Sequence, residues 1–198
     1  ANILMLYGRQ AQTALKTVDN LDIEMILTGH GISWRSHIKD ILDLYNKWSN
    51  FEADEHKALV VFDSMWHSTE LIAKTIGEAF NAKGISTKYC DLKVVHYSDI
   101  VTDFLDSEYI AVGSPTLNNN MMPNVAAFLC YLKGLTPKKS NRKALAFGSY
   151  GWGGQSIALV QKGLEEIGFD IFHDMIRIAN QPTDEDLDNI YNSIIEKL

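Results

Sequence analysis

The fold is decided by Ala58-Leu-Val-Val-Phe62, an apolar run, and by the polar stretch that follows it directly, Asp63-Ser-Met-Trp-His-Ser-Thr69. Five consecutive apolar, β-favouring residues predict a strand that is buried on both faces. The next residues carry apolar side chains at helical spacing, at Ile72, Ile76 and Phe80, and so predict a helix. A strand that runs through a hydroxyl-rich loop into a helix N-terminus indicates an anion-binding site, because the first N–H groups of a helix have no acceptor within it.

The residue types in this loop narrow the choice of anion. The loop contains neither Gly-x-x-x-x-Gly-Lys nor Gly-x-Gly-x-x-Gly, which excludes a P-loop nucleotide site and a dinucleotide site. Ser64, Ser68 and Thr69 supply hydroxyls without a nearby Lys or Arg. Such a cradle suits a single phosphomonoester. The alternative interpretation is an ordinary Ser/Thr helix cap.

Composition and charge are those of an ordinary globular protein. The chain has 198 residues, of which 46% are hydrophobic, and 4 prolines, which fits one α/β domain with an appendage. A formal net charge of −7 argues against binding to nucleic acid or to a membrane, and the longest apolar run, residues 125–132, is too short to span a bilayer. Cys90 and Cys130 match no metal or redox spacing. With no secretory signal expected, the sequence predicts a cytoplasmic protein.

Residues 1–57 are expected to be part of a larger unit, because the chain starts without Met inside an apolar segment. The patterns in this region predict a helix over residues 9–20, a short strand over residues 23–27 and an amphipathic helix over residues 36–51. Thr28-Gly-His-Gly31 places His30 between two glycines in a tight turn. The polar residues 52–57 are the best candidate for a linker.

From residue 58 onward, strands and helices alternate. Strands are expected over residues 58–62, 85–90, 109–112 and 143–147 and within residues 169–178. Helices are expected over residues 69–83, 97–105, 124–133 and 155–167 and after Pro182-Thr183. Ser98 is the expected cap of the second of these helices. Five strands that alternate with five helices predict a parallel, doubly wound α/β sheet, in which ligands bind beyond the carboxyl ends of the strands.

Two more loops follow buried strands, Gly113-Ser-Pro-Thr-Leu-Asn-Asn-Asn120 and Gly148-Ser-Tyr-Gly-Trp-Gly-Gly154. The first offers Thr116 and three asparagines, which tolerate left-handed backbone and can meet the polar edge of a ring. The second places Tyr150 and Trp152 among four glycines, so that an aromatic face can approach a flat ligand. Together with the phosphate cradle, these loops describe a site for flavin mononucleotide (FMN). The alternatives are a plain turn for the asparagines and, for Trp152, a surface aromatic packed on its own loop.

The sequence resembles a known family, the A-type flavoproteins, which are also called flavodiiron proteins. Residues 63–69, 113–120 and 147–152 are similar to the family's three FMN loops. Thr28-Gly-His-Gly31, with Trp34, is similar to the stretch that closes the family's metallo-β-lactamase-like domain.

The resemblance implies a division of the chain into two parts. Residues 1–57 would be the C-terminal remnant of a metallo-β-lactamase-like domain plus a linker, and residues 58–198 a flavodoxin-like FMN-binding domain. The implied fold of the second part is a three-layer α/β/α sandwich with a five-stranded parallel sheet of order 2-1-3-4-5, preceded by a short α/β remnant.

The residues that the resemblance assigns to FMN come from all three loops. They are Ser64, Met65, Trp66, His67, Ser68, Thr69, Pro115, Thr116, Leu117, Asn118, Asn119, Ser149, Tyr150, Gly151, Trp152, Gly153 and Gly154. The implied function is electron transfer: FMN takes electrons from a rubredoxin-like or flavin reductase donor and passes them to a di-iron site that reduces O₂ or NO. In the family that site faces the FMN of another subunit, so a homo-oligomer is expected.

The sequence departs from the family in its iron ligands. The family's His-x-Glu-x-Asp-His stretch is absent, and His30 is the single, vestigial candidate ligand. A lone His cannot hold an iron pair, so we expect no di-iron centre in this chain. The predicted function is therefore an electron-transfer domain whose di-iron site lies elsewhere. The alternatives are a stand-alone flavodoxin-like carrier, an NAD(P)H:quinone reductase, and a flavodoxin-like interaction module without FMN.

Overall fold

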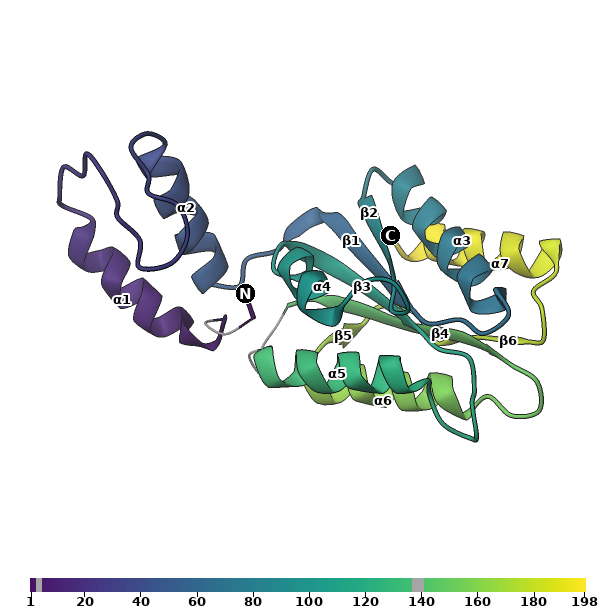
Figure 1. Ribbon diagram of the computed structural model, residues 1–198. Coiled ribbons are helices and arrows are strands. Elements are labelled where there is room, and N and C mark those ends of the chain that lie inside the picture. The colour runs from purple at the N-terminus through teal and green to yellow at the C-terminus, as the bar shows by residue number, and fades with distance from the viewer. Residues whose placement is uncertain (3–4, 137–140) are drawn as a thin grey trace.

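The computed structural model describes residues 1–2, 5–136 and 141–198. Figure 1 shows a small helical unit at the N-terminal end of the chain, beside a sandwich in which helices cover both faces of one sheet. The N-terminal unit contains a short 3-10 helix (Met5–Tyr7), α1 (Gly8–Val18) and α2 (Ile38–Ser49). All later elements belong to the sandwich.

The sheet is parallel throughout. Its strands are β1 (Asp54–Phe62), β2 (Ser86–Asp91), β3 (Ser107–Gly113), β4 (Lys143–Tyr150), β5 (Asp170–Ile171) and β6 (Ile176–Ala179). The order is β2-β1-β3-β4-β5, and β6 also pairs with β4. The predicted flavodoxin-like order is confirmed. The last predicted strand, however, is two short strands, because Phe172 between them turns into the core against Phe80 and Tyr109.

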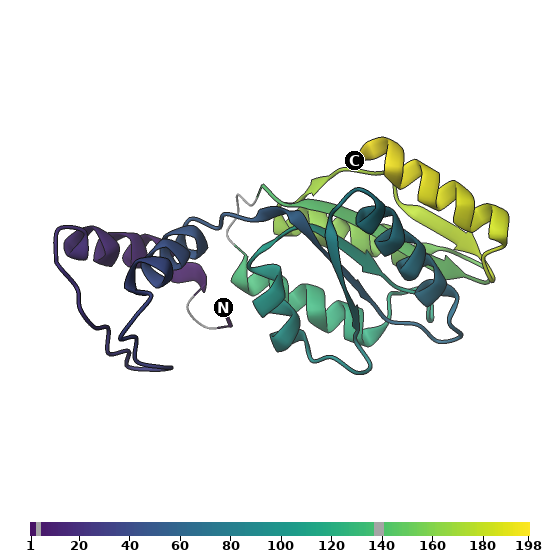
Figure 2. The same ribbon diagram turned by 90° about the horizontal axis from the view of Figure 1, so that it is seen from above.

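Helices form the two outer layers, as both views show (Figures 1 and 2). One face carries α3 (Ser68–Ala82) and α7 (Asp184–Lys197), and the other carries α4 (Tyr97–Phe104), α5 (Pro123–Leu135) and α6 (Gln155–Ile167). Val60 packs in the core cluster beneath α3 and α7, and Val61 packs in the core cluster beneath α4, α5 and α6. Since neighbouring strand residues point to opposite faces, this confirms the prediction of a strand buried on both sides. Within the described ranges, no helix is long and apolar enough to cross a membrane.

Strand register places the ends of β1 and β3 level, and β4 continues past them to Tyr150. Phe62 of β1 pairs with Gly113 of β3, and Gly113 pairs with Phe147 of β4. The ladder continues into the loops, because the Asp63 N–H donates to the Gly113 carbonyl and the Ser114 N–H to the Phe147 carbonyl. The loops that follow β1, β3 and β4 therefore start at one edge of the sheet.

Two of the described helices, α4 and α7, begin with a side-chain cap. The Thr183 hydroxyl and the Asp186 carboxylate form a capping box at the start of α7. At α4 the predicted cap, Ser98, is wrong. His96 occupies the cap position, and its Nδ1 accepts the Ser98 N–H at 3.3 Å, because an unprotonated imidazole nitrogen can take the place of a hydroxyl as acceptor.

The N-terminal unit is built on the contact between α1 and α2. A Cβ at Gly8 would lie 2.4 Å from the Ser49 carbonyl oxygen, and Gln12 donates to the side chains of Asn46 and Ser49. The strand predicted over residues 23–27 is wrong, because that segment makes a single bridge, from Ile26 to Trp34, and not a ladder. The predicted linker is also too long, since β1 already begins at Asp54.

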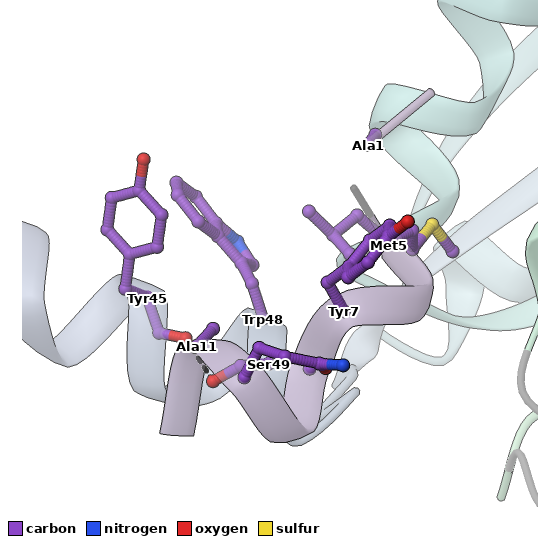
Figure 3. Close-up of a pocket in the computed structure, with 10 residues that line it drawn as sticks. Ala1, Met5, Tyr7, Ala11, Tyr45, Trp48 and Ser49 are labelled. Carbon is purple, nitrogen blue, oxygen red and sulfur yellow. Dashed lines mark hydrogen bonds between the residues drawn. The ribbon is translucent and has the colours of Figure 1, made fainter. Parts of the chain in front are cut away.

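An apolar hollow of about 210 Å³ lies in this unit. Figure 3 shows Tyr7, Tyr45 and Trp48 around it, with Met5 at its edge. Met5 is itself buried in the core cluster that α4, α5 and α6 share. The hollow therefore sits where the N-terminal unit meets the sandwich.

The two parts are joined by polar contacts at the start of β3. The Trp48 indole N–H donates to Asp106 Oδ1 at 3.0 Å. Arg142, fully buried beneath this junction, donates to the main-chain oxygens of Phe51 at 3.4 Å and Leu105 at 2.6 Å. Burial lowers the pKa of Arg142 to about 10, and the carbonyl acceptors stabilise its charge.

Candidate functional site

A cleft opens where the three predicted loops meet. It has a volume of about 300 Å³ and is lined by Met65, Trp66, Ser68, Pro115, Thr116, Ser149, Tyr150, Gly151, Asn180 and Gln181. Eight of these ten residues belong to the predicted site. Asn180 and Gln181 were missed. They follow β6, and the Asn180 N–H donates to the Tyr150 carbonyl at 2.7 Å, which brings a fourth strand-end loop to the cleft.

The first loop forms a cradle at the start of α3. His67 is the N-cap residue with φ of 66°, and it turns the chain into the helix. Ser68 then borders the cleft, while Thr69 is buried and its hydroxyl lies 2.9 Å from that of Ser149. The two hydroxyls share one hydrogen bond, so one of their two O–H groups remains free to donate.

The Ser64 hydroxyl is the most informative atom of the cradle. Its oxygen is buried and finds no hydrogen-bond partner among the described residues. Leaving a buried polar atom unpaired costs about 1–3 kcal/mol, so such an atom indicates a missing ligand group. This atom and the open N–H groups of the first turn of α3 fit a phosphate.

A cation does lie beside this loop, contrary to the sequence analysis. Lys93, in the loop after β2, donates from Nζ to the Ser64 carbonyl oxygen at 2.8 Å. On the other side of the same residue, the Ser64 N–H donates to Asp63 Oδ1 at 2.7 Å, and Asp63 Oδ2 accepts from the Asn124 amide at 2.9 Å. Asp63 is fully buried, so these contacts form a small network beneath the cradle.

The second loop combines a buried anchor with an exposed turn. The Thr116 N–H donates to the Ser149 carbonyl at 3.0 Å, which ties this loop to the third. Beyond it, Asn118 and Asn119 have φ of 50° and 60°, and Leu117 and Asn120 exchange main-chain hydrogen bonds. This is a two-residue turn of the type that favours asparagine, as in the plain-turn alternative, and contact of these asparagines with a ligand stays a prediction.

The third loop presents aromatic side chains. Trp152 has a relative exposure of 105%, and Trp66 of the first loop has one of 86%. The alternative that Trp152 packs on its own loop is therefore wrong. Tyr150 is half-buried, and the Arg177 guanidinium lies 5.6 Å from the centre of its ring. Trp66 lines the cleft and Trp152 directly follows Gly151, which also lines it. Exposed aromatics in such positions are suited to stacking on a flat ligand.

The glycines of the third loop differ in what surrounds them, and their predicted approach to a flat ligand stays a prediction. A Cβ at Gly148 would lie 2.0 Å from the Ser114 carbonyl oxygen, whereas one at Gly151 would have nothing within 4 Å. Gly148 is thus required for the close approach of the second and third loops. A Cβ at Gly153 would meet Gln155, and one at Gly154 would meet Arg177.

An ion-pair chain borders the cradle on the solvent side. His67 Nδ1 lies 2.7 Å from Glu70 Oε2, and Lys74 Nζ lies 2.7 Å from Glu70 Oε1. Hydrogen bonds from His67 and then from Lys74 lower the pKa of Glu70 to about 2. Glu70 also lies in the first turn of α3, where the helix dipole favours a negative charge.

His30 is exposed and lies far along the chain from these loops, in the turn where Gly31 has φ of 101°. No group of three or more His, Cys, Asp or Glu side chains in the described part of the chain is placed to hold a metal ion. That His30 is a vestigial ligand, and that the chain holds no di-iron centre, both stay predictions.

The flavodoxin family model matches residues 60–194. The chain belongs to the flavodoxin family. The match contains all three loops, and membership implies a flavin as the cofactor.

Relatives of this chain include O₂ and NO reductases and a flavodiiron protein. The chain is 34% identical to a rubredoxin-oxygen oxidoreductase of Megalodesulfovibrio gigas and 34% identical to a nitric oxide reductase of Moorella thermoacetica, each over 96% of this chain and 48% of the relative. The crystal structure of the flavodiiron protein from Giardia intestinalis matches 98% of this chain with a TM-score of 0.92 and 31% identity, again over 48% of its own length. This chain is thus a flavodoxin-like domain homologous to the FMN domain of flavodiiron O₂ and NO reductases, and it spans about half the length of these relatives.

Proposed function

We propose that residues 58–198 bind one FMN and act as the electron-transfer domain of a flavodiiron-type oxidoreductase. The observation that carries the proposal is the convergence of three strand-end loops on one cleft, with the unpartnered Ser64 hydroxyl buried in the first loop. The family relationship supports a flavin. The small cradle supports the mononucleotide, because it offers groups for one phosphate and not for a pyrophosphate.

The chain's own residues divide between the two ends of the cofactor. Ser64, Ser68 and Thr69, with the N–H groups that open α3, hold the phosphate. Trp152 stacks on the ring, and Trp66 is the second aromatic candidate. The other residues assigned to the site border the ring and its side chain: Met65, His67, Pro115, Thr116, Leu117, Asn118, Asn119, Ser149, Tyr150, Gly151, Gly153 and Gly154. Once bound, FMN supplies the electron transfer, and these residues bind and orient it.

The partners in the proposal follow from the relatives' names. One relative is a rubredoxin-oxygen oxidoreductase and another a nitric oxide reductase. We therefore assign a rubredoxin-type electron donor to this domain, with a flavin reductase as the alternative donor. The location that we propose is the cytoplasm. A di-iron site held outside this chain would be the acceptor and would reduce O₂ or NO. In this proposal residues 1–57 form the end of a metallo-β-lactamase-like domain.

FMN binding is tested directly with the purified chain. We expect a yellow protein that releases FMN on denaturation, and an apoprotein that quenches the fluorescence of one equivalent of added FMN. FAD should bind more weakly because its second phosphate finds no partner in the cradle. A colourless protein that neither retains nor quenches FMN would contradict the proposal.

Metal analysis tests the assignment of the di-iron site to another part of the system. We expect less than one iron atom per chain and no reduction of O₂ or NO beyond that of the flavin alone. Two iron atoms per chain with turnover would show that the chain is complete in itself.

A further inference from the structure

We infer that Lys93 and Asp63 are positioning residues for the flavin phosphate, which hold Ser64 by its two main-chain groups and leave its hydroxyl for the ligand. The inference rests on the proposed function and extends it to two residues that were not assigned to the flavin site. It starts from one atom, the buried and unpartnered oxygen of Ser64.

Several other hydroxyls around the cleft have hydrogen-bond partners within the protein. Those of Thr69 and Ser149 bond to each other, and those of Thr116 and Ser156 do the same, at 2.9 and 2.8 Å. The Ser114 hydroxyl donates to the Pro115 carbonyl. Ser64 differs from them, because its main chain is bonded on both sides while its side chain is not.

The two main-chain bonds of Ser64 come from different elements. Its N–H donates to Asp63 Oδ1 at 2.7 Å, and its carbonyl accepts from Lys93 Nζ at 2.8 Å. Together they fix the peptide groups on both sides of the Ser64 Cα, and so restrict where the side chain can lie. A hydroxyl that is held in place before the ligand arrives loses less freedom on binding, which strengthens the bond it makes.

Asp63 also links the cradle to the second loop. Its Oδ2 accepts from the amide of Asn124, at the start of α5, at 2.9 Å. The carboxylate is fully buried, so it has no solvent to replace a lost partner. Its negative charge does not favour an anion nearby, which leaves its hydrogen bonds as the reason for its position.

Lys93 contributes in two ways. Its hydrogen bond orients Ser64, and its ammonium adds a positive charge to a cradle that otherwise has only neutral donors. The side chain is 42% exposed, and Asp91 Oδ2 lies 3.8 Å from its nitrogen. Solvent and Asp91 both weaken its field, so we assign the larger part of its effect to the hydrogen bond.

The first test compares FMN with riboflavin, which lacks the phosphate. In fluorescence titrations, Lys93→Met should bind FMN about tenfold more weakly than the parent and riboflavin equally well. Lys93→Arg should restore most of the loss. The matched control is Lys133→Met, which removes a lysine paired at 2.7 Å with Glu166, on the outer surface of α5 and α6. Equal FMN affinity in Lys93→Met and the parent would overturn the inference.

A double-mutant cycle separates positioning from charge. If Lys93 acts by placing the Ser64 hydroxyl, Lys93→Met should weaken FMN far less in a Ser64→Ala background than in the parent. Additive losses would show that Lys93 acts independently of Ser64 and would overturn the positioning role. Parent protein that binds no FMN at all would instead contradict the proposed function.

Asp63 is tested by a pair of variants. Asp63→Asn keeps an acceptor oxygen for the Ser64 N–H and removes a negative charge. Its new amide N–H₂ faces Asn124, whose own amide can turn over to present its oxygen, so this variant should bind FMN at least as tightly as the parent. Asp63→Ala removes the acceptor and should weaken FMN and not riboflavin. Equal losses for both flavins in Asp63→Ala would show a merely structural role and would overturn the assignment for this residue.

Discussion

At the scale of single residues, the assignment of the flavin ring depends on two side chains, Trp152 and Trp66. Both are almost fully exposed, although large aromatic side chains are normally buried in good part. Trp66 lines the cleft, and Trp152 directly follows Gly151, which also lines it. Stacking of a flat ring on such a side chain contributes about 1–3 kcal/mol. We therefore expect Trp152→Ala to weaken FMN about ten- to a hundredfold, as measured by fluorescence titration, and to shift the flavin absorbance spectrum.

Conservative and distant variants make this prediction specific. Trp152→Phe keeps an aromatic face and should retain most of the affinity. Trp34 lies in the N-terminal unit, so Trp34→Ala should leave FMN binding unchanged. An unchanged affinity and spectrum in Trp152→Ala would transfer the stacking role to Trp66, which Trp66→Ala would test in the same titration.

Gly148 and Gly151 provide a matched pair in the third loop. Gly148→Ala would place a methyl group 2.0 Å from the Ser114 carbonyl, whereas Gly151→Ala would place one in open space. We expect Gly148→Ala to destabilise the fold by about 1–3 kcal/mol in urea unfolding and to weaken FMN by separating the second and third loops. Gly151→Ala should change neither quantity. Equal stability in the two variants would show that the loops can separate without cost.

The site residues that the sequence predicted differ from those that it missed in how they reach the site. Ser64, Ser68 and Trp152 stand in loops whose composition is unusual by itself. Lys93 and Asn180 come from the ends of other strands, and their contacts depend on the order and register of the sheet. No local pattern contains that information. A stricter use of the rule that all strand-end loops share one edge would have included the loop after β6.

Among the elements, α3 shows how a helix start gathers charge around the cradle. His67 and Lys74 lower the pKa of Glu70 to about 2, from 4.5 in an unstructured chain. Ionised Glu70 therefore stabilises the fold above pH 4.5, and this contribution is lost as the pH falls toward 2. Both partners are largely exposed, so the contribution is below about 1 kcal/mol.

A pH series of urea unfolding checks this sign. Glu70→Gln should lower the free energy of unfolding at neutral pH by less than about 1 kcal/mol, and the difference from the parent should vanish at low pH. Glu78→Gln, on the same helix, is the control for the removal of a carboxylate from α3. A Glu70→Gln defect that persists unchanged at low pH would mean that packing, and not charge, is responsible.

The accuracy of the predicted elements follows the strength of their patterns. The helix over residues 155–167 has the predicted bounds, because an apolar stripe and Gly168 define it from both sides. The segment of residues 23–27 has a strand-like composition but no neighbouring strand to pair with, so only the Ile26 bridge forms. Propensity alone does not make a strand where the rest of a sheet is not present.

At the scale of the whole molecule, the two parts of the chain bury their apolar side chains very differently. The sandwich has two dense core clusters. The N-terminal unit, in contrast, leaves Leu27 at 74%, Leu21 at 62% and Tyr45 at 46% relative exposure. The hollow beside Tyr45 and Trp48 adds to this apolar surface (Figure 3). Apolar surface of this extent is usually covered by another protein surface.

The last prediction is that a second copy of the chain covers the N-terminal unit. A dimer that pairs one surface with itself is the commonest arrangement, and the exposed residues of α2 are placed for it. We expect sedimentation velocity to show concentration-dependent self-association of the full chain. Leu44→Lys with Tyr45→Lys should abolish it, while Leu159→Lys on α6 should not. Removal of residues 1–52 keeps β1, which begins at Asp54, and should leave a monomer that still binds FMN. That monomer should also unfold at lower urea, because Arg142 loses the Phe51 carbonyl and the core loses Met5. A full chain that stays monomeric at every concentration would leave the apolar surface to a different partner.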